Sequence, residues 1–554
     1  MYSITAIVTS FMAGLSIGSF VLGKYADKFE NPLKIYGLVE LLIAIYSVFF
    51  PQFVALSDSI IVKLFYLFAE HPDYLLAFRF LLCFFMLFFP TFLMGGTLPL
   101  LTRFLSFYLQ DISFPMAILY FINTLGAAAG SLTAGFYLIP SSGLKGALGI
   151  TVILTAFVGV IAFIFSLLLE YLKLLKVPAE NAQTEQITDE PHTQEFGKIG
   201  FLLIAFITGF VSMNLEVAWM QLFSLLFGST VYSFSLVLSG YLFGIAAGSL
   251  LFSCARKLGY VFKRIHLAFL LLLAAFLICY SSTLLPFVSY FILFIKRNIN
   301  LNFNGQMYLF FITTVLCIGF PMLLLGISFP MLLSFYEKDL NFSGSSTGNL
   351  YGVNCIGSIL GTFSFSFILL PTLGLKNNFL FCVFLFVLTS LILLKGLLNT
   401  RTILFYLGCL VLIFPPFFIQ WNPNLLQAGI FRFHSRLSGK LPETPDRKQK
   451  ILFHREEPQA IVSVFEVKVT GGKSKVLVIN GKNDAGTSAI LLDSLTMVNL
   501  GLFPLLSAQG EGPLSVLVIG LGCGMTVATL LEDKRVGKID VIEISPAVLE
   551  AGSI

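Results

Sequence analysis

A succession of apolar segments, most about 20 residues or longer, fills the first three quarters of the chain. A helix of about 20 apolar residues crosses the hydrocarbon core of a bilayer. Within lipid, only helices and closed barrels satisfy their own backbone hydrogen bonds. The segments are too long to be the strands of a barrel, and their apolar and polar residues do not alternate as barrel strands require. The sequence therefore predicts a multi-pass α-helical membrane bundle with spans near residues 3–22, 35–55, 77–101, 116–140, 148–172, 201–226, 231–253, 266–292, 308–334, 349–371, 377–397 and 402–420.

The composition excludes a soluble fold. Of the 554 residues, 57% are hydrophobic and 11% are charged, whereas soluble domains carry roughly 25% charged residues. The net charge of +5 is small for this length, so nucleic acid is not expected as a partner. The eight cysteines are far apart and mostly lie in or beside apolar runs, so neither a disulfide framework nor a metal site is expected. The expected partner is the lipid bilayer, and the resemblance described below implies a bacterial inner membrane as the location.

Three separated blocks of the first half recur in the second half at an almost constant distance of 230 or 231 positions. They include "MAGLSIGS" and its later counterpart "LFGIAAGS", and "YFINTLGAAAG" with "YGVNCIGSILG". Two halves with the same helix order are expected to be related by an axis along the membrane normal, as in parallel-repeat transporters. The matching blocks are 1–19 with 231–249, 89–99 with 320–330, and 120–145 with 351–376.

The repeat also predicts a helix that this chain does not contain. The second half opens with a span at 201–226, and the equivalent span of the first half would precede Met1. We therefore expect the first half to lack its first helix. The predicted organisation is a first transmembrane repeat at 1–175, a polar loop at 176–199, a second repeat at 200–398, an additional transmembrane or interfacial helix at 399–420, a β-rich region at 421–510, and a truncated Rossmann-like unit at 511–554.

Four polar residues inside apolar runs are candidates for a functional site. Glu40 and Glu216 are carboxylates at membrane depth, where charge is costly and often marks a substrate or ion path. The alternative for both is a protonated or paired structural residue. Asn123 and Asn354 occupy equivalent positions of the repeat and predict either interhelical hydrogen bonds or a central polar site. Glycines four residues apart, such as Gly14 and Gly18 or Gly126 and Gly130, predict close helix packing.

The loops carry unequal charge, which predicts the orientation of the bundle. One alternate set of loops holds most of the lysines and arginines, including Lys24, Lys28, Arg103 and Arg256, and should be cytoplasmic. Twelve crossings would then return the C-terminal region to the outside. Because the segment at 402–420 contains two adjacent prolines and could be interfacial, the side of that region stays open.

The C-terminal region is richer in charge and turns: about 27 of the 63 charged residues lie in 421–554. Residues 451–480 alternate around "TGGKS" and predict a β-hairpin. Beyond them, "SVLVIGLGCGMTVATLLED" reads as a buried strand, a glycine turn and a helix, and a second strand leads to Glu543, 23 positions after Gly520. The predicted nucleoside-binding residues are Gly520, Gly522, Cys523, Gly524 and Glu543.

This pattern favours an adenosyl-methionine-type nucleoside site over a dinucleotide site. The spacing is G-x-G-x-G rather than G-x-G-x-x-G, and a carboxylate about 20 residues after the turn can bind ribose hydroxyls. The alternative is a Rossmann-like unit that binds no ligand. Because the chain stops just after the second strand, we expect this unit to be incomplete and this chain to be inactive as an enzyme.

Together, the motifs resemble a family of bacterial membrane proteins in which a major-facilitator-like helical region is fused to a spermidine-synthase-like domain. The resemblance covers nearly the whole chain and rests on "MAGLSIGS", "MGGTLPLLTR", "YFINTLGAAAGSLTAGFYLIP", "NLEVAW", "NGKNDAGTS" and "VLVIGLGCGMT…VIEISPAV". The first loop, "GKYADKFENPLK", is also similar to the loop motif of the major facilitator superfamily. The resemblance implies aminopropyl transfer from decarboxylated S-adenosylmethionine to an amine such as putrescine, with no metal.

The chain departs from soluble spermidine synthases in the part of the site that would hold the amine. Those enzymes have an aspartate in the glycine turn, where this chain has Cys523, and their amine-binding aspartate lies beyond the end of this sequence. Asp484 and Asp493 are the nearby carboxylates and are predicted either to contact the amine or to begin a turn and a helix. No catalytic residue is predicted.

Three functions remain open from the sequence. The first is a membrane-bound transferase of spermidine-synthase type. The second is a transporter or sensor whose appended domain binds a nucleoside without catalysis. The third is a methyltransferase that uses S-adenosylmethionine in the same glycine turn.

Overall fold

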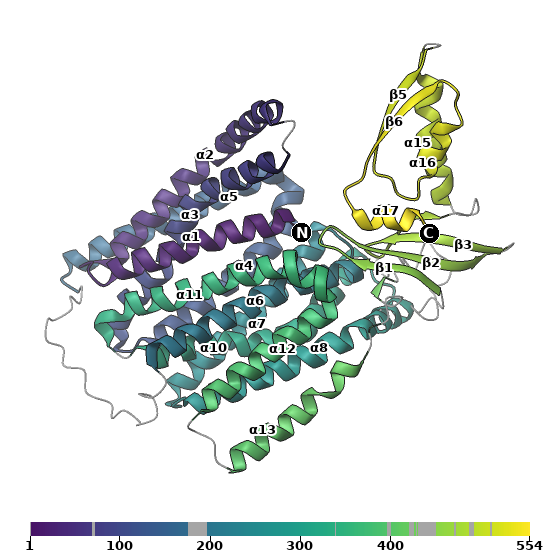
Figure 1. Cartoon of the computed structure of the whole chain (residues 1–554). Coiled ribbons are helices and arrows are strands. Elements are labelled where there is room, and N and C mark those ends of the chain that lie inside the picture. The colour runs from purple at the N-terminus through teal and green to yellow at the C-terminus, as the bar shows by residue number, and fades with distance from the viewer. Residues whose placement is uncertain are drawn as a thin grey trace.

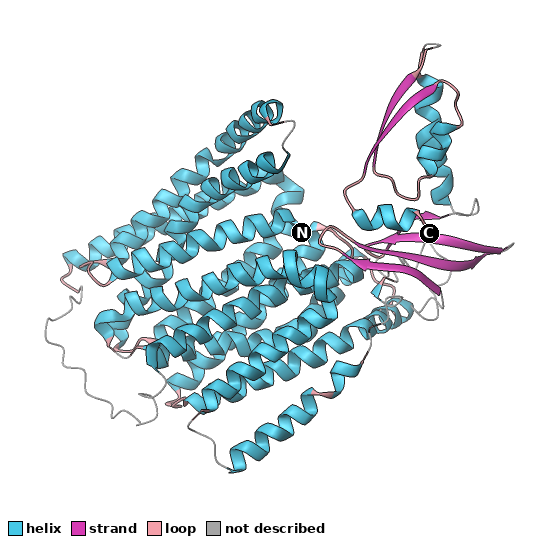
Figure 2. Ribbon diagram, in the orientation of Figure 1, coloured by secondary structure: helices cyan, strands magenta, loops and turns pink. Residues whose placement is uncertain are grey.

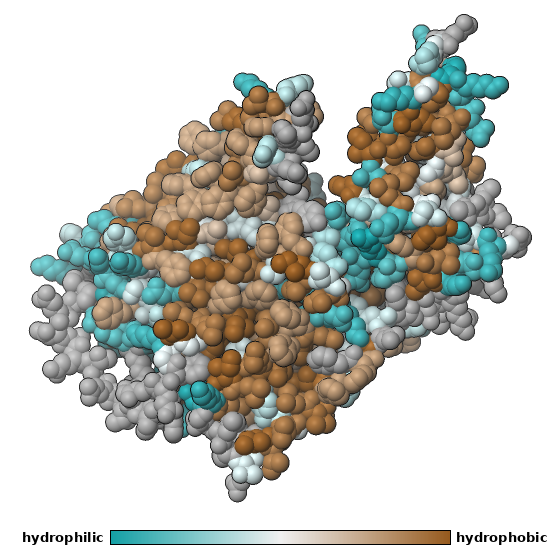
Figure 3. Space-filling view, viewed as in Figure 1, coloured by the Kyte–Doolittle hydropathy of each residue, from teal (hydrophilic) through white to brown (hydrophobic). Residues whose placement is uncertain are grey.

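The computed structural model describes the chain in residues 2–68, 72–174, 197–337, 339–395, 400–419, 421, 426–427, 429, 450–469, 472–486, 492–509 and 512–554. Most of the predicted polar loop at 176–199 lies outside the described residues. Within them, a large helical bundle adjoins a smaller part that contains all the strands (Figure 1). In the space-filling view of Figure 3, apolar side chains dominate the visible surface of the bundle between two more polar ends.

Each predicted span coincides with helical structure in the bundle, and several helices extend beyond the predicted ends. Those of the first half are α1 Tyr2–Ala26, α2 Pro32–Leu67, α3 Pro72–Leu109, α4 Ser113–Thr133 and α5 Ile139–Tyr171. Those of the second half are α6 Gly197–Phe227, α7 Val231–Lys257, α8 Arg264–Asn298, α9 Phe303–Thr314, α10 Phe320–Tyr336, α11 Ser343–Ser364 and α12 Leu370–Leu394. The last helix of the bundle is α13 Thr400–Ile413.

Nine helical stretches of the described chain are long and apolar enough to cross a membrane. Two of them, Ser113–Tyr171 and Leu340–Leu394, are 59 and 55 residues long, and each turns back at a glycine with non-helical geometry. These two contribute two crossings each, so the nine stretches make eleven crossings. The chain is an integral, multi-pass membrane protein.

The two turning points demonstrate the predicted repeat in three dimensions. Gly143 has φ 67° and Gly374 has φ 74°, and the two are 231 positions apart. Short π-helical segments at Ala134–Leu138 and Phe365–Leu369 precede them, again 231 positions apart. Positive φ favours glycine because a Cβ would clash with the backbone. The two glycines lie in the sequences "PSSGLK" at 140–145 and "PTLGLK" at 371–376, so each half bends sharply between two helices at the same place of the repeat.

The repeated glycines of α1 and α7 bring helix backbones into contact, as predicted. A Cβ added to Gly18 would lie well under 3.0 Å from the carbonyl oxygen of Phe92 on α3, and one added to Gly248 would meet Leu323 on α10 in the same way. Small residues of this kind let helices approach closely in lipid. The prediction of close packing is wrong for Gly126 and Gly130, where an added Cβ would meet nothing within 4 Å.

Asp27 joins the two halves at one end of the bundle. Its carboxylate accepts hydrogen bonds of 2.8 Å from the backbone N–H groups of Gly344 and Ser345, which begin α11. The guanidinium of Arg103 lies 3.6 Å from the same carboxylate and donates to the carbonyl oxygen of Leu340 at 2.5 Å. Burial raises the pKa of Asp27, while the hydrogen bonds from Ser345 and Gly344 and the charge of Arg103 oppose that rise.

Replacing Asp27 by Ala should cost about 2–4 kcal/mol of stability, because it removes a helix cap and leaves the Arg103 charge unpaired. Asp27→Asn should cost less, since it removes the desolvated charge and retains an acceptor oxygen. The midpoint of thermal unfolding in detergent would measure both, with the exposed Lys24→Ala as a control. Equal midpoints for Asp27→Ala and the unaltered chain would show that this contact does not join the halves.

The C-terminal part contains two separate sheets (Figure 2). The first is antiparallel in the order β1-β2-β3-β4, and the predicted hairpin is its β2–β3 pair. The second is a parallel pair, β5 and β6, with α16 between them in the chain. The strand–turn–helix–strand prediction is confirmed as local structure, while the larger sheet of a complete doubly wound domain is not seen in the described residues. The elements are β1 Lys450–Glu456, β2 Ile461–Val469, β3 Gly472–Ile479, β4 Lys482–Gly486, α15 Leu492–Ser507, β5 Leu514–Ile519, α16 Met525–Leu531, β6 Val536–Ile542 and α17 Pro546–Gly552.

The path of α13 decides at which end of the bundle this part lies. Near the start of α13, Arg264 of α8 donates to the carbonyl oxygen of Lys395 at 2.7 Å. Near its end, Tyr280 of α8 donates to the carbonyl oxygen of Leu412 at 3.0 Å. These two contacts place α13 along α8, running in the same direction; with 14 residues it is shorter than the stretches that are long enough to cross a membrane. The first sheet then lies at the end of the bundle where α12 bends (Figure 1).

The C-terminal end of the chain is therefore expected on the outer side of the membrane. The bend of α12 is at the opposite end from the loops rich in lysine and arginine, and those loops are expected in the cytoplasm. Alkaline phosphatase fused after Ile554 should be active in a bacterial host, and green fluorescent protein at the same position should be dark. Bright fluorescence with an inactive phosphatase would reverse the assignment.

Candidate functional site

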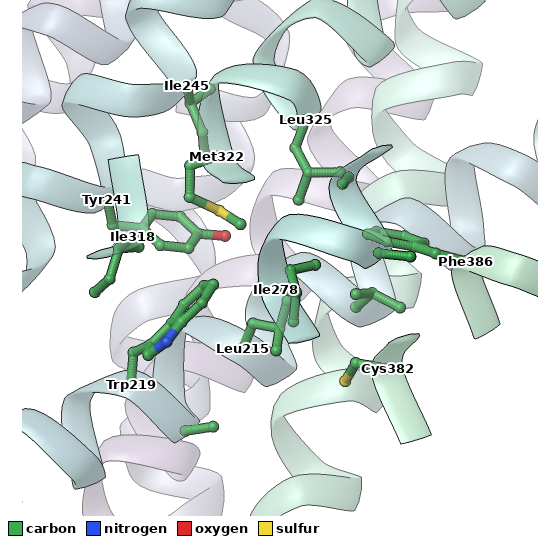
Figure 4. Packing of buried hydrophobic residues seen from close by; sticks show 14 of the residues in the cluster. Leu215, Trp219, Tyr241, Ile245, Ile278, Ile318, Met322, Leu325, Cys382 and Phe386 are labelled. Atoms are coloured by element: carbon green, nitrogen blue, oxygen red, sulfur yellow. The ribbon is translucent and has the colours of Figure 1, made fainter. Parts of the chain in front are cut away.

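Glu216 lies within α6, inside a transmembrane stretch, and faces the interior of the bundle. It is close enough to Tyr241 of α7 for an electrostatic interaction, and Tyr241 is only 2% exposed. The hydroxyl group of Tyr241 hydrogen-bonds to the Ser212 side chain and donates to the Ser212 carbonyl oxygen at 2.8 Å. Tyr241 thus spans from α7 to α6 beside the carboxylate. In Figure 4 its ring lies near Trp219 and Met322 in the packed interior.

Two further tyrosines meet at this place from opposite halves. Tyr120 of α4 and Tyr351 of α11 are 231 positions apart, so they are equivalent in the repeat. Both pack against Phe329 of α10, with ring centroids 5.3 and 6.0 Å apart. Tyr120 interacts electrostatically with both Tyr351 and Tyr241. We call Glu216, Tyr241, Tyr120 and Tyr351 the central cluster.

A buried amide network lies next to the central cluster and fixes α6 to α12. The Asn214 side-chain oxygen accepts a 2.7 Å hydrogen bond from the Asn378 amide, and the Cys382 thiol lies 3.2 Å from the same oxygen. Both asparagines are fully buried. The side-chain oxygen of Asn378 and the indole N–H of Trp219 have no partner in the described structure. The sequence analysis did not predict Asn378, which looks like an ordinary polar residue in "GLKNNFLF".

The remaining intramembrane candidates have different environments. Glu40 on α2 hydrogen-bonds to Tyr36, one turn earlier on the same helix, which fits the alternative of a locally paired residue. Asn354 on α11 donates a 2.9 Å hydrogen bond to the carbonyl oxygen of Ala205 on α6. This is the interhelical hydrogen bond that the sequence predicted. Asn123 is exposed and makes no hydrogen bond in the described structure, so the equivalent prediction fails for the first half.

The glycine turn and Glu543 come together in the C-terminal part. Gly520, Gly522 and Gly524 all have positive φ, at 89°, 57° and 77°. The Glu543 carboxylate accepts 2.9 Å hydrogen bonds from the backbone N–H groups of Leu521 and Ser545. It therefore holds the turn in place, and this contact uses acceptor positions that a ribose would also need.

The other predicted residues of this part are not shown to join a common site. The Cys523 sulfur lies 3.6 Å from the sulfur of Met497 on α15. Asp484 forms a 2.8 Å salt bridge with Lys482 on the same strand. The side chain of Asp493, near the start of α15, lies outside the described residues. No group of three His, Cys, Asp or Glu side chains suited to a metal occurs in the described residues.

A pocket of about 540 Å³ that the sequence did not predict lies between the bend of α12 and strand β1. At its edge, the Glu456 carboxylate accepts a 2.6 Å hydrogen bond from the backbone N–H of Leu375, next to Gly374. His454, Arg455 and Glu457 also line the pocket. The charged sequence "HREE" at 454–457 was the one feature from which a polar site could have been predicted. Only the fold shows that these residues face the bend of α12. The contact ties the sheet to a bend that recurs in both halves.

No protein-family model matches the chain. No curated protein matches it either. Among solved structures, the human organic anion transporter MFSD10 is 13% identical with a TM-score of 0.42, over 70% of this chain and 83% of that one. The E. coli fucose:proton symporter FucP is 13% identical with a TM-score of 0.36, over 72% and 98%. The nucleoside transporter NupG is 13% identical with a TM-score of 0.32, over 71% and 98%.

Proposed function

We propose that this protein is a membrane transporter whose binding site is the central cluster, and that it carries small organic cations such as amines. The observation that carries the proposal is the position of Glu216, an acidic side chain inside a transmembrane stretch. It lies next to Tyr241, which in turn interacts with Tyr120 of the other half. Ionisable residues within the membrane usually serve a path for substrate or ions. In parallel-repeat transporters, the substrate site lies where the repeats meet.

The chemistry of the cluster suits a cation. A carboxylate attracts an ammonium group directly, and the faces of tyrosine rings attract cations through their electron-rich centre. Within the described residues, no Lys, Arg or His forms a salt bridge with Glu216. A carboxylate in these surroundings is expected to hold either a proton or a cationic substrate, because an unpaired buried charge is costly. Exchange of one for the other would couple substrate movement to a proton gradient.

Uptake of radiolabelled putrescine into proteoliposomes tests this function. With the vesicle interior more acidic than the medium, putrescine should accumulate, and a proton ionophore should prevent accumulation. Vesicles without the protein serve as the control. If putrescine and other primary amines do not enter protein-containing vesicles faster than empty ones, the proposal of an amine transporter fails.

A second candidate function is nucleoside binding, with or without group transfer, in the C-terminal part. The positive φ angles of the three glycines and their contact with Glu543 favour it, because a turn without side chains lets a ligand approach the backbone. S-adenosylmethionine or its decarboxylated form would be the cosubstrate. Aminopropyl transfer would release methylthioadenosine, whereas methyl transfer would release S-adenosylhomocysteine. The expected outer position of this part weighs against catalysis, since these sulfonium compounds are made in the cytoplasm.

Calorimetry with S-adenosylmethionine, its decarboxylated form and methylthioadenosine measures this binding. If Glu543 holds the ribose, Glu543→Gln should weaken binding about tenfold, the effect of losing about 1.4 kcal/mol from a charge-assisted hydrogen bond. Glu532→Gln, after the next helix, is the matched control. Heat of binding without release of methylthioadenosine or S-adenosylhomocysteine supports a domain that binds but does not catalyse. Absence of heat with all three compounds contradicts a nucleoside site in this chain.

A further inference from the structure

The central cluster provides a single negative charge. Glu216 is the only Asp or Glu in α4, α6, α7, α10 and α11, the helices whose side chains form the cluster or pack against it. The basic residues of these five helices lie near helix ends, at Lys198, Arg256 and Lys257. A substrate that reaches the cluster therefore meets one carboxylate, and these helices supply no second acidic side chain.

The outer half of α6 is enclosed except along one narrow face that includes Glu216. Between residues 211 and 228, every residue is buried except four half-buried ones, which are Ser212, Glu216, Met220 and Ser224. A spacing of four residues places side chains above one another on the same face of a helix. At 1.5 Å per residue, this face is about 18 Å long. Glu216 thus keeps some exposed surface where the rest of the helix is packed.

The groups around this carboxylate are mostly aromatic. Trp219 lies about one turn along α6 from it and is fully buried, and in Figure 4 its ring lies near that of Tyr241. Tyr120 continues this surface, because it interacts with Tyr241. The ring of Phe329 joins Tyr120 to Tyr351, with centroid distances of 5.3 and 6.0 Å. Tyr120 and Tyr351 are only half-buried, so both rings keep surface that a ligand can contact.

We propose that the central cluster selects amines that carry one ammonium group on an aromatic or apolar body over diamines. This inference rests on the proposed function and names the substrate class of the same site. The ammonium group pairs with Glu216, and the body packs against the tyrosine rings, since contacts between aromatic rings are favourable. The second ammonium group of a diamine finds no second carboxylate, and an unpaired charge among apolar groups is costly. Attraction to the faces of the rings compensates for only part of that cost.

Competition binding to the purified full chain in detergent tests this selectivity. Radiolabelled phenethylamine is the bound probe. The competitors n-butylamine and putrescine share a four-carbon chain and differ by one ammonium group, so n-butylamine should compete about tenfold better. Unlabelled phenethylamine should compete about tenfold better than n-butylamine, because its ring buries more apolar surface. Putrescine competing as well as n-butylamine would overturn the proposal, and equal competition by n-butylamine and phenethylamine would overturn the preference for an aromatic body.

A second carboxylate on the open face of α6 should reverse the selectivity. Met220→Glu places it one turn from Glu216, and residues four apart on a helix have Cβ atoms roughly 5–6 Å apart, a span that a four-carbon diamine can bridge. Met220→Gln is the matched control, because it has the same size and a polar end without the charge. Relative to this control, Met220→Glu should improve competition by putrescine over n-butylamine about tenfold. An unchanged ratio would contradict the proposal.

The outcomes separate this inference from the proposed function. If phenethylamine shows no saturable binding while putrescine enters proteoliposomes, the selectivity fails and the proposed function stands. If neither amine is bound or carried, both fail together. If the thermal midpoint shows that Met220→Glu does not fold, the comparison of n-butylamine with putrescine on the unaltered chain still decides the selectivity.

Discussion

Replacement of Glu216 by Gln is expected to reduce proton-driven uptake of putrescine by about 30-fold or more. Loss of a desolvated contact between opposite charges costs about 2 kcal/mol or more, and 1.4 kcal/mol corresponds to a factor of ten. Glutamine keeps the size of the side chain and removes both the charge and the exchangeable proton. Uptake in proteoliposomes gives the rate, and the thermal midpoint in detergent shows whether the variant still folds.

Glu40→Gln is the matched control for this prediction. Glu40 is also a membrane-depth carboxylate, but its partner is Tyr36 on its own helix α2. Its replacement should change uptake by less than about twofold, in the range of surface or locally paired groups. If Glu216→Gln transports putrescine at the normal rate while folded, the central cluster is not the amine site. If both variants lose uptake equally, the effect is not specific to that cluster.

Replacement of Gly248 by Val is expected to prevent stable folding of the bundle. The new Cβ would lie well under 3.0 Å from the Leu323 carbonyl oxygen, and a backbone atom cannot move aside as a side chain can. Overpacking typically costs 1–3 kcal/mol, and we expect about 3 kcal/mol or more here because both contacting groups are backbone. The variant should elute as an aggregate on size-exclusion chromatography, or its midpoint of thermal unfolding should fall strongly.

Gly149→Val provides the comparison, because an added Cβ there meets nothing within 4 Å. Both substitutions replace a helical glycine by the same β-branched residue, so differences in helix propensity largely cancel. Gly149→Val should fold with a midpoint close to that of the unaltered chain. Equal behaviour of the two variants would mean that the crossing of α7 and α10 is looser than the structure shows.

The helices could be predicted from the sequence because the length and apolar composition of each segment are enough to indicate a transmembrane helix. The predicted spans near 3–22 and 231–253 correspond to α1 and α7, with ends that differ by a few residues. The end of α2 is further off, at Leu67 rather than near residue 55, because apolar residues continue past the predicted end of the span. The glycine turn with Glu543 was also predictable, since the contact joins neighbouring strands.

The central cluster was only partly predictable. Glu216 stands out in the sequence because a carboxylate is rare in an apolar helix. Tyr241, Tyr120 and Tyr351 do not stand out, because this chain contains 19 tyrosines and 61 phenylalanines. Only the packing of α4, α6, α7 and α11 shows that Tyr241 lies beside the carboxylate, and that Tyr120 lies close to both Tyr241 and Tyr351.

The sequence by itself determined which segments enter the membrane and that they form two related halves. These properties depend on local apolar composition and on motifs that recur at a fixed distance in the chain. The tertiary structure decided what each repeated residue contacts. Asn123 and Asn354 occupy the same motif, yet one is exposed and the other binds α6. The difference arises because the hydrogen-bond partner comes from a neighbouring helix. The local sequence around a residue does not determine which helix packs against it.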